Sequence, residues 1–539
     1  MTQQQETWWE TGVVYQVYVR SFADGSGDGT GDIAGLRSRL PYLKKLGVDA
    51  LWMNPWYASP LRDGGYDVSD YRKIDKRFGT LAEVEKLIKE AHGMGLKIIA
   101  DLVPNHTSID HAWFKKALAG KPGGPERDRY IFKKGKGAKG AKPPNDWTAV
   151  FGGSAWEPVG DGWWYLHIFD VSQPDLNWEN EEVRAEFDSV FRFWLDRGID
   201  GFRIDVAHGL IKDRKFPNLG KVGALLESDR MANHPFWDRD GVHEIIRRWR
   251  KIVDEYENRM MVAEAWVSAD RLPLYLRPDE YHQSFNFDLL SEPWDAVGFG
   301  KVLSKSVKAA EKIGAASTWV LSNHDVMRHA TRYGLAKKAN WRSWPITGPV
   351  RDLDVELGNR RARAACLITM SLPGSTYVYQ GEELGLPEVW DLPEEVLDDP
   401  TWLRSEGTEK GRDGARVPLP WKRKGKSFGF GKGGAWLPQP EYFGEYSSAA
   451  QAGDPNSMLE LYRKAMKVRR KHLIDDQSFT LVEPDKRKTV LSYQRGDVLV
   501  VVNMGSRPVN IPEGEIILAS LPGITNKLPA NAAVWLKTS

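Results

Sequence analysis

Four short segments of this chain each join an apolar run to acidic, histidine or asparagine side chains. They are 101–106 (Asp-Leu-Val-Pro-Asn-His), 201–205 (Gly-Phe-Arg-Ile-Asp), 262–265 (Val-Ala-Glu-Ala) and 321–325 (Leu-Ser-Asn-His-Asp). Such apolar runs are typical of buried strands, so the polar residues fall where strands would end. Carboxylates at strand ends on one face of a barrel form a rigid acid–base site. A pair of these carboxylates is the equipment that cleaves a glycosidic bond.

Strand-like and helix-like segments alternate along most of the chain. Amphipathic segments such as 81–94 and 183–196 predict helices. The eight strand candidates are 13–19, 49–53, 96–102, 201–205, 260–264, 284–287, 317–322 and 375–379. Eight strand–helix repeats predict an α/β fold, a closed parallel (β/α)8 TIM barrel.

The alternation is interrupted once and stops before the C-terminus. Residues 108–174 are rich in Gly, Pro, Lys and Trp, and predict a subdomain inserted after the third strand. From about Thr480 short strands and turns predict an antiparallel β domain. The expected units are barrel residues 1–107 and 175–470, inserted subdomain 108–174 and C-terminal β domain 471–539.

Composition excludes several other classes of protein. The 539 residues carry 75 Lys and Arg against 73 Asp and Glu, a net charge of +2 that favours neither nucleic acid nor an acidic membrane as partner. The single cysteine, Cys366, cannot form an internal disulfide. The sequence also contains no long uncharged apolar stretch of the kind that predicts a membrane helix. We expect a cytoplasmic enzyme, with its oligomeric state left open.

Two carboxylates have the surroundings that acid–base chemistry needs. Arg203 and Asp205 are two residues apart on a predicted strand, so both side chains point the same way, and the guanidinium favours the ionised carboxylate that a nucleophile requires. Glu264 leaves an apolar strand, where partial loss of water favours the protonated form of an acid catalyst. For an isolated motif, a structural ion pair would be the favoured interpretation of Arg203 and Asp205, and a helix N-cap or a surface carboxylate is the less favoured interpretation of Glu264.

The four segments, in this order, resemble the characteristic regions of the α-amylase family of retaining glycoside hydrolases. Residues 14–22, 65–71 and 173–177 are similar to its α-glucosidase and oligo-1,6-glucosidase branch, and the resemblance spans about 13–421. It implies that Asp205 is the nucleophile and Glu264 the general acid/base. Asp325 is implied to stabilise the oxocarbenium-like transition state.

The resemblance also implies how the sugar is held. It assigns His106 and His324 to the sugar bound at the carboxylates, with Arg203 as companion of Asp205. Tyr66 is implied to stack on the ring, and Phe169 to form a wall of the pocket. Asp101 and Asn105 are interpreted as scaffold.

Exo-action requires groups that close the pocket behind the terminal sugar. The resemblance implies that Asp67 and Arg412 hold the outer hydroxyls, with Arg416 as a competing candidate for the arginine. The resemblance implies that the substrates are short α-glucosides, with α-1,4-linked maltose-type sugars favoured. It implies that the enzyme needs no organic cofactor. A glucosyltransferase or a sucrose- or trehalose-directed isomerase would use the same carboxylates. A non-catalytic binding relative is disfavoured because it would lose them.

Two further features are less specific. Val206-Ala207-His208, after the implied nucleophile, matches no linkage pattern of the branch cleanly, and the long connection 209–240 is expected to shape the acceptor side of the pocket. Asp24, Ser26, Asp28, Thr30 and Asp32 place oxygen donors at alternate positions with glycines between them, as calcium loops do. They predict a structural cation site for calcium, or magnesium, and resemble a calcium loop of this branch. A solvated acidic turn is the alternative.

Overall fold

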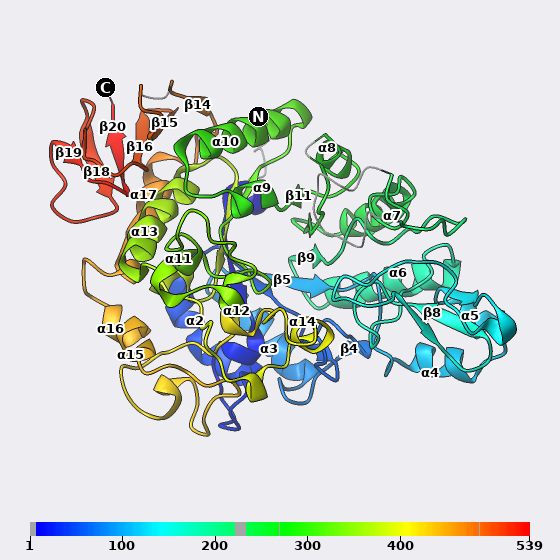
Figure 1. Cartoon of the computed structure of the whole chain (residues 1–539). Coiled ribbons are helices and arrows are strands. Elements are labelled where there is room, and N and C mark those ends of the chain that lie inside the picture. The colour runs from blue at the N-terminus through cyan, green and yellow to red at the C-terminus, as the bar shows by residue number, and fades with distance from the viewer. Residues whose placement is uncertain (1–6, 221–232, 269, 484–485, 539) are drawn as a thin grey trace.

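The computed structural model describes residues 7–220, 233–268, 270–483 and 486–538, and the middle of the 209–240 connection lies outside them. Its largest sheet has eight parallel strands in the order β11-β10-β9-β5-β2-β1-β13-β12 (Figure 1). They are β1 (Val13–Val17), β2 (Ala50–Met53), β5 (Lys97–Leu102), β9 (Gly201–Ile204), β10 (Met260–Ala263), β11 (Gln283–Ser284), β12 (Thr318–Val320) and β13 (Ser375–Tyr379). The hydroxyl of Thr318 donates to the carbonyl of Ser284 at 2.6 Å, which joins the two ends of this order. The predicted barrel is confirmed.

The barrel strands are apolar on both faces because both faces are covered. Every residue of β1, β2, β9 and β10 is buried. The Trp52 ring lies 5.2 Å from that of Phe285 and 6.3 Å from that of Tyr377, although their strands are not neighbours. These contacts therefore cross the barrel interior, which is packed with side chains.

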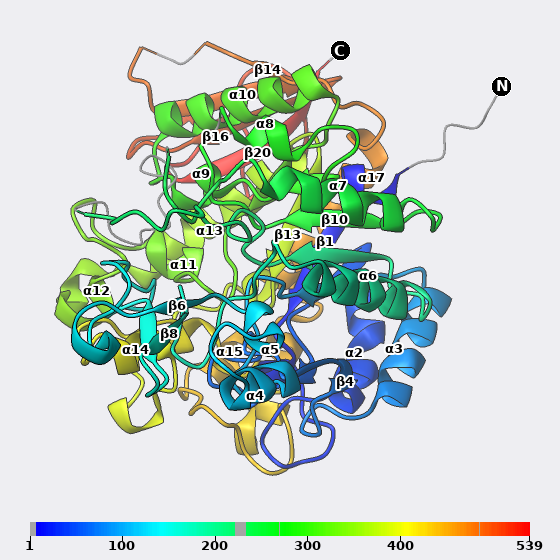
Figure 2. The ribbon, with the colours of Figure 1, turned by 90° about the vertical axis from the view of Figure 1, so that its right-hand side faces the viewer.

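The helices cover the outside of the barrel, where Figure 2 shows α2, α3 and α6. A capping box starts α3, since the backbone N–H of Thr80 donates to Glu83 at 2.8 Å and that of Glu83 donates to the Thr80 hydroxyl at 3.3 Å. The long helices are α2 (Ile33–Leu46), α3 (Leu81–Gly93), α6 (Glu181–Leu195), α7 (Val242–Val253), α10 (Ala296–Ile313), α13 (Val355–Ser371) and α17 (Met458–His472). In the described part of the chain none is long and apolar enough to cross a bilayer.

The segment predicted as an insertion follows β5 and extends away from the barrel, at the right of Figure 1. It contains helices α4 (Ala112–Ala119) and α5 (Pro125–Asp128). Its sheet is antiparallel, in the order β6 (Phe132–Lys134), β8 (Trp163–Leu166) and β7 (Trp156–Pro158). The hairpin β3 (Tyr57–Ala58) and β4 (Asp70–Ile74) lies in the loop after β2. The domain boundaries themselves stay predictions.

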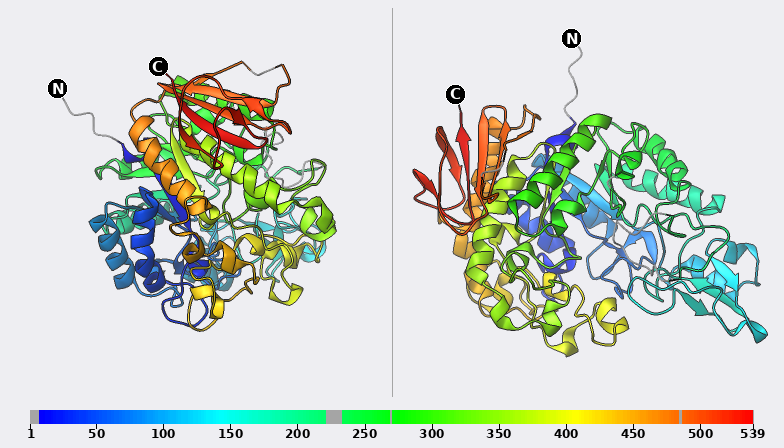
Figure 3. Two further views of the ribbon diagram at one scale, coloured as in Figure 1. Left: turned by 90° about the vertical axis from the view of Figure 1, so that its left-hand side faces the viewer. Right: turned by 45° about the horizontal axis from the view of Figure 1, so that its top comes forward.

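A β domain ends the chain, as predicted. Its main sheet is antiparallel in the order β14-β15-β16-β20-β18, and β17 pairs with β19. The strands are β14 (Thr480–Leu481), β15 (Val490–Arg495), β16 (Val498–Asn503), β17 (Val509–Asn510), β18 (Glu515–Ala519), β19 (Lys527–Leu528) and β20 (Ala532–Lys537). The indole of Trp535 donates to the carbonyl of Leu367 in α13 at 3.0 Å, which fixes this sheet against the helices that Figure 3 shows beside it.

A buried glutamate ties the end of the last barrel strand to α17. Glu382 accepts a hydrogen bond from the Tyr462 hydroxyl at 2.8 Å and one from the backbone N–H of Tyr379 at 3.3 Å. Burial raises the pKa of Glu382 to about 8, although both donors oppose the shift. The side chain is therefore largely neutral in the folded protein at pH 7.

This neutral glutamate makes stability depend on pH. An unfolded glutamate titrates near its ordinary value, so the folded state binds the proton more tightly, and stability falls as pH rises toward 8. Glu382→Gln removes this titration. We expect the loss of melting temperature between pH 5 and 8.5 to be smaller in Glu382→Gln than in the wild type, measured by scanning calorimetry. An identical loss in both proteins would contradict the assignment.

Candidate active site

One arginine joins three carboxylates at the C-terminal ends of neighbouring strands. Arg203 contacts Asp101 at 2.8 Å, Asp205 at 2.6 Å and Glu264 at 2.7 Å. The strand register explains the contacts: Asp101 of β5 pairs with Arg203 of β9, and Val262, two residues before Glu264, is its partner in β10. Residues two apart on a strand share a side, so all four side chains converge.

The backbone after Asp205 is turned toward Glu264. Val206 has a φ of 46°, a left-handed conformation that costs a β-branched residue energy. This conformation directs its N–H to Glu264 Oε2 at 3.1 Å, and the N–H of Ala207 donates to the Glu264 carbonyl at 2.9 Å. The strained turn therefore ties the segment that carries Asp205 to Glu264.

Burial controls the charge of two of the carboxylates that Arg203 contacts. It raises the pKa of Asp205 well above its usual range, with Glu264 and Asp101 adding to the shift and Arg203 opposing it. Burial also raises the pKa of Asp101 to about 6. Arg203 was expected to keep Asp205 ionised, and the contact forms, but one guanidinium does not offset burial beside two further carboxylates. Asp205 therefore holds its proton to higher pH than an exposed aspartate does.

A second arginine organises the opposite side of the site. Arg412 contacts Asp325 at 3.0 Å, Asp63 at 2.6 Å and Asp399 at 2.6 Å. Arg416, the competing candidate, contacts Asp325 at 3.2 Å. Burial alone would raise the pKa of Asp325, but His324, Arg412 and Arg416 lower it. Asp325 is therefore an anion, and both arginines belong to the site.

The prediction that Asp67 is the partner of Arg412 is wrong. The Asp67 side chain is fully buried and accepts hydrogen bonds from the Ser59 hydroxyl at 2.8 Å and from the backbone N–H of Asp63 at 3.2 Å. Gly64 and Gly65 have positive φ angles of 57° and 109°, which turn the chain between the two aspartates. The Asp63 side chain contacts Arg412, whereas the Asp67 side chain accepts its hydrogen bonds from within the loop.

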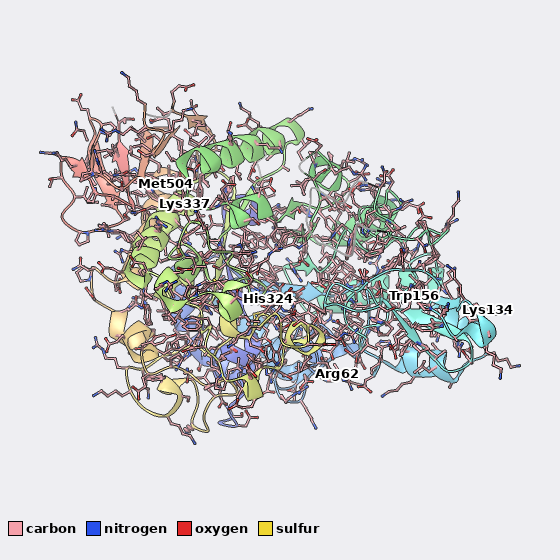
Figure 4. All side chains as sticks on the ribbon, viewed as in Figure 1. Arg62, Lys134, Trp156, His324, Lys337 and Met504 are labelled. Atoms are coloured by element: carbon pink, nitrogen blue, oxygen red, sulfur yellow. The ribbon has the colours of Figure 1, made fainter. Side chains whose placement is uncertain are left out.

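The predicted sugar-binding residues lie close together. His324, near the centre of the molecule in Figure 4, stacks on Tyr66 with ring centres 5.1 Å apart, and the Tyr66 hydroxyl donates to Asp101 at 2.8 Å. His106 is buried, with its ring 5.4 Å from that of Phe169. Phe151 lies 5.8 Å from Phe169 and is covered by the Arg412 guanidinium at 5.0 Å. These aromatic rings and Arg412 therefore form a connected set of contacts beside Asp325.

Asp63, Asp399 and Trp266 also lie at this site, although no sequence motif pointed to them. Asp63 stands three residues before Tyr66 in the glycine turn, and this position is the signal that could have identified it. Asp399 caps α14 (Pro400–Arg404), far away in sequence. The Trp266 indole donates to Glu264 Oε1 at 3.1 Å.

The predicted cation loop is arranged as a helix cap. Asp32 accepts hydrogen bonds from the backbone N–H groups of Ser26 at 2.8 Å and Gly35 at 2.6 Å, and Asp24 accepts from that of Gly29 at 2.9 Å. Among the described residues, no three His, Cys, Asp or Glu side chains gather as metal ligands. A cation at Asp24, Ser26, Asp28, Thr30 and Asp32 stays a prediction.

Comparison with known proteins identifies the family. The model of the alpha amylase catalytic domain matches residues 16–477. The oligo-1,6-glucosidase of Parageobacillus thermoglucosidasius is 35% identical over 505 residues, covering 87% of this chain and 84% of the relative.

Two solved structures are similar over the whole chain. The alpha-glucosyl transfer enzyme XgtA has a TM-score of 0.86 at 32% identity, covering 99% of this chain and 100% of that one. A mutant isomaltulose synthase from Erwinia rhapontici NX5, solved with sucrose, has a TM-score of 0.85 at 30% identity, covering 99% of both chains. The chain is therefore a glycoside hydrolase of the α-amylase family.

Proposed function

We propose that the protein is a retaining, exo-acting α-glucosidase that releases α-glucose from the non-reducing end of short α-glucosides. The observation that carries this proposal is the attachment of Asp205 and Glu264 to one guanidinium at the ends of adjacent strands. A retaining glycosidase needs two carboxylates at close range, one negative and one protonated. Asp205 and Glu264, which contact the same Arg203 guanidinium at 2.6 Å and 2.7 Å, lie at this close range.

The proposed reaction has two displacements. In the first, an Asp205 oxygen attacks the anomeric carbon, the glycosidic C–O bond breaks, and Glu264 gives its proton to the departing oxygen. In the second, Glu264 removes a proton from water, the water oxygen attacks the same carbon, and Asp205 leaves as the carboxylate. Asp325, held as an anion by Arg412 and Arg416, stabilises the positive charge that develops on the sugar ring.

The sugar-binding groups suit a single terminal glucose. Arg412 links Asp325 to Asp63 and so closes one end of the site with charged hydrogen-bonding groups that suit outer hydroxyls. Tyr66, His106, His324 and Phe169 supply the ring faces and imidazoles around it. We assign these roles as proposals, with maltose-type α-1,4 linkages favoured over α-1,6. The free, buried Cys366 is consistent with a cytoplasmic location, which we also propose.

A glucosyltransferase or isomerase is the second candidate. It is favoured by the likeness to XgtA and to the isomaltulose synthase, whose names describe glucosyl transfer and isomaltulose formation. Such an enzyme would pass the glucosyl group from Asp205 to a sugar hydroxyl in place of water. The proposed nucleophile and acid/base would be unchanged, so only the products separate the two functions.

Product analysis tests the proposed function. Purified protein is incubated separately with maltose, isomaltose, sucrose and trehalose, and the products are followed by proton NMR. We expect maltose to be cleaved fastest, with α-glucose appearing before mutarotation. Asp205→Asn, purified in the same way, should be folded and inactive. New disaccharides in place of glucose would identify the transferase, and β-glucose as the first glucose released from an aryl α-glucoside, whose leaving group is not a sugar, would overturn retention.

The two aspartates near Arg412 give a matched pair of variants. Asp63→Asn should lower kcat/KM for an aryl α-glucoside by about 100-fold, because a charged hydrogen bond to the sugar is lost, while the melting temperature changes little. Asp67→Asn should lower the melting temperature more and kcat/KM less than Asp63→Asn does. The reason is that the Asp67 carboxylate accepts hydrogen bonds from Ser59 and from the backbone of Asp63 within the loop. The reverse pattern in kinetics and calorimetry would return the sugar-binding role to Asp67.

A further inference from the structure

Trp266 stands two residues after Glu264, and its indole donates to Glu264 Oε1 at 3.1 Å. We propose that Trp266 is a positioning residue whose N–H orients Glu264 and favours its ionised form. Trp266 would thereby affect Glu264 both as the acid of the first displacement and as the base of the second. The catalytic consequence rests on the proposed function, whereas the hydrogen bond from Trp266 to Glu264 is independent of it.

The position of Trp266 follows from the same strand geometry as the Arg203–Asp205 pair. Extended residues two apart share a side, so the chain that leaves β10 carries Trp266 to the face occupied by Glu264. A hydrogen bond to the ionised form of an acid stabilises that form. The neutral indole supplies this stabilisation without adding a charge to the site.

The ring of Trp266 is fixed by a neighbouring aromatic side chain. Its ring centre lies 3.8 Å from that of Phe287, with 4° between the planes. Phe287 is buried and begins α9 (Phe287–Ser291), which Asn286 caps by accepting from the N–H of Leu289 at 3.3 Å. The direction of the indole N–H is therefore set by packing, so the donor is preorganised toward Glu264.

The two oxygens of Glu264 have different partners. Oε2 accepts from Val206 N–H at 3.1 Å and contacts Arg203 at 2.7 Å. Oε1 accepts from the Trp266 indole at 3.1 Å. Loss of the indole N–H therefore leaves Oε1 without that donor, while the charged groups of the site stay in place.

The ionisable groups around Glu264 and Trp266 come from several parts of the fold. Those of the strand ends are Arg203 and Asp205 from β9 and its end, His208 beyond it, Asp101 from β5, and His324 and Asp325 after β12. Those of the cavity wall that includes Trp266 are Asp288, Glu292, Lys305 and Arg342. None of these side chains is altered in Trp266→Phe, which also keeps an aromatic ring against Phe287. A change in the titration of Glu264 in that variant therefore reports the lost donor.

The pH dependence of Trp266→Phe tests the proposal by kinetics. Loss of a donor that favours the ionised carboxylate should move the alkaline limb of kcat/KM for an aryl α-glucoside to higher pH than in the wild type. The second displacement needs the ionised base and should slow, so kcat and KM should fall together. A purely structural role would leave the alkaline limb at its wild-type pH and would not lower KM.

Trp294→Phe is the matched control. Trp294 is also half-buried and donates its indole N–H, to Asn531 at 2.9 Å, but lies away from Glu264. We expect its alkaline limb to match the wild type. A folded Trp266→Phe enzyme with the same alkaline limb as Trp294→Phe would overturn the proposal.

An NMR titration of the full chain labelled with ¹⁵N-tryptophan tests the hydrogen bond without turnover. The Trp266 indole signal, identified by its loss in Trp266→Phe, should shift as Glu264 titrates and should lose this dependence in Glu264→Gln. A pH-independent wild-type signal would overturn the proposal. If the indole titrates but no α-glucoside is cleaved, the proposed function fails while the hydrogen bond stands.

Discussion

The buried guanidinium of Arg203 is the charge on which the catalytic end of the barrel depends. It is 2% exposed, and a buried cation without partners costs several kcal/mol. Asp101, Asp205 and Glu264 compensate it from three adjacent strands, so the strand register and the ion pairs support each other. One cation does not neutralise three carboxylates, and burial raises the pKa of Asp205 well above its usual range. The shared charge thus explains the geometry of the site, and burial explains why Asp205 holds its proton.

Arg412 repeats this arrangement on the sugar-recognition side. It joins Asp63, Asp325 and Asp399, which come from the loop after β2, the end of β12 and the cap of α14. These segments are far apart in sequence, so the arginine is what brings their carboxylates to one point. The barrel places the proposed reacting groups at its strand ends, whereas the groups proposed to recognise the terminal sugar are brought together from loops around Arg412.

The sequence predicts the fold and the contact between Arg203 and Asp205 well because both follow from local pattern. Apolar runs mark the barrel strands, and the i, i+2 spacing places Arg203 beside Asp205. The assignment of Asp67 as the partner of Arg412 failed because two positive-φ glycines turn the chain between Asp63 and Asp67, a conformation that spacing alone does not reveal. The sequence alone also does not predict the raised pKa of Asp205, because this shift depends on burial and on carboxylates from other strands.

Trapping of the glycosyl-enzyme tests the central claim most directly. A 5-fluoro-α-glucosyl fluoride has a leaving group that needs no acid, and its ring fluorine slows breakdown of the covalent intermediate. After brief exposure, digestion and mass spectrometry, the account predicts one fluoroglucosyl group on the peptide that contains Asp205. A label on another peptide, or turnover of the reagent with no covalent label, would contradict it.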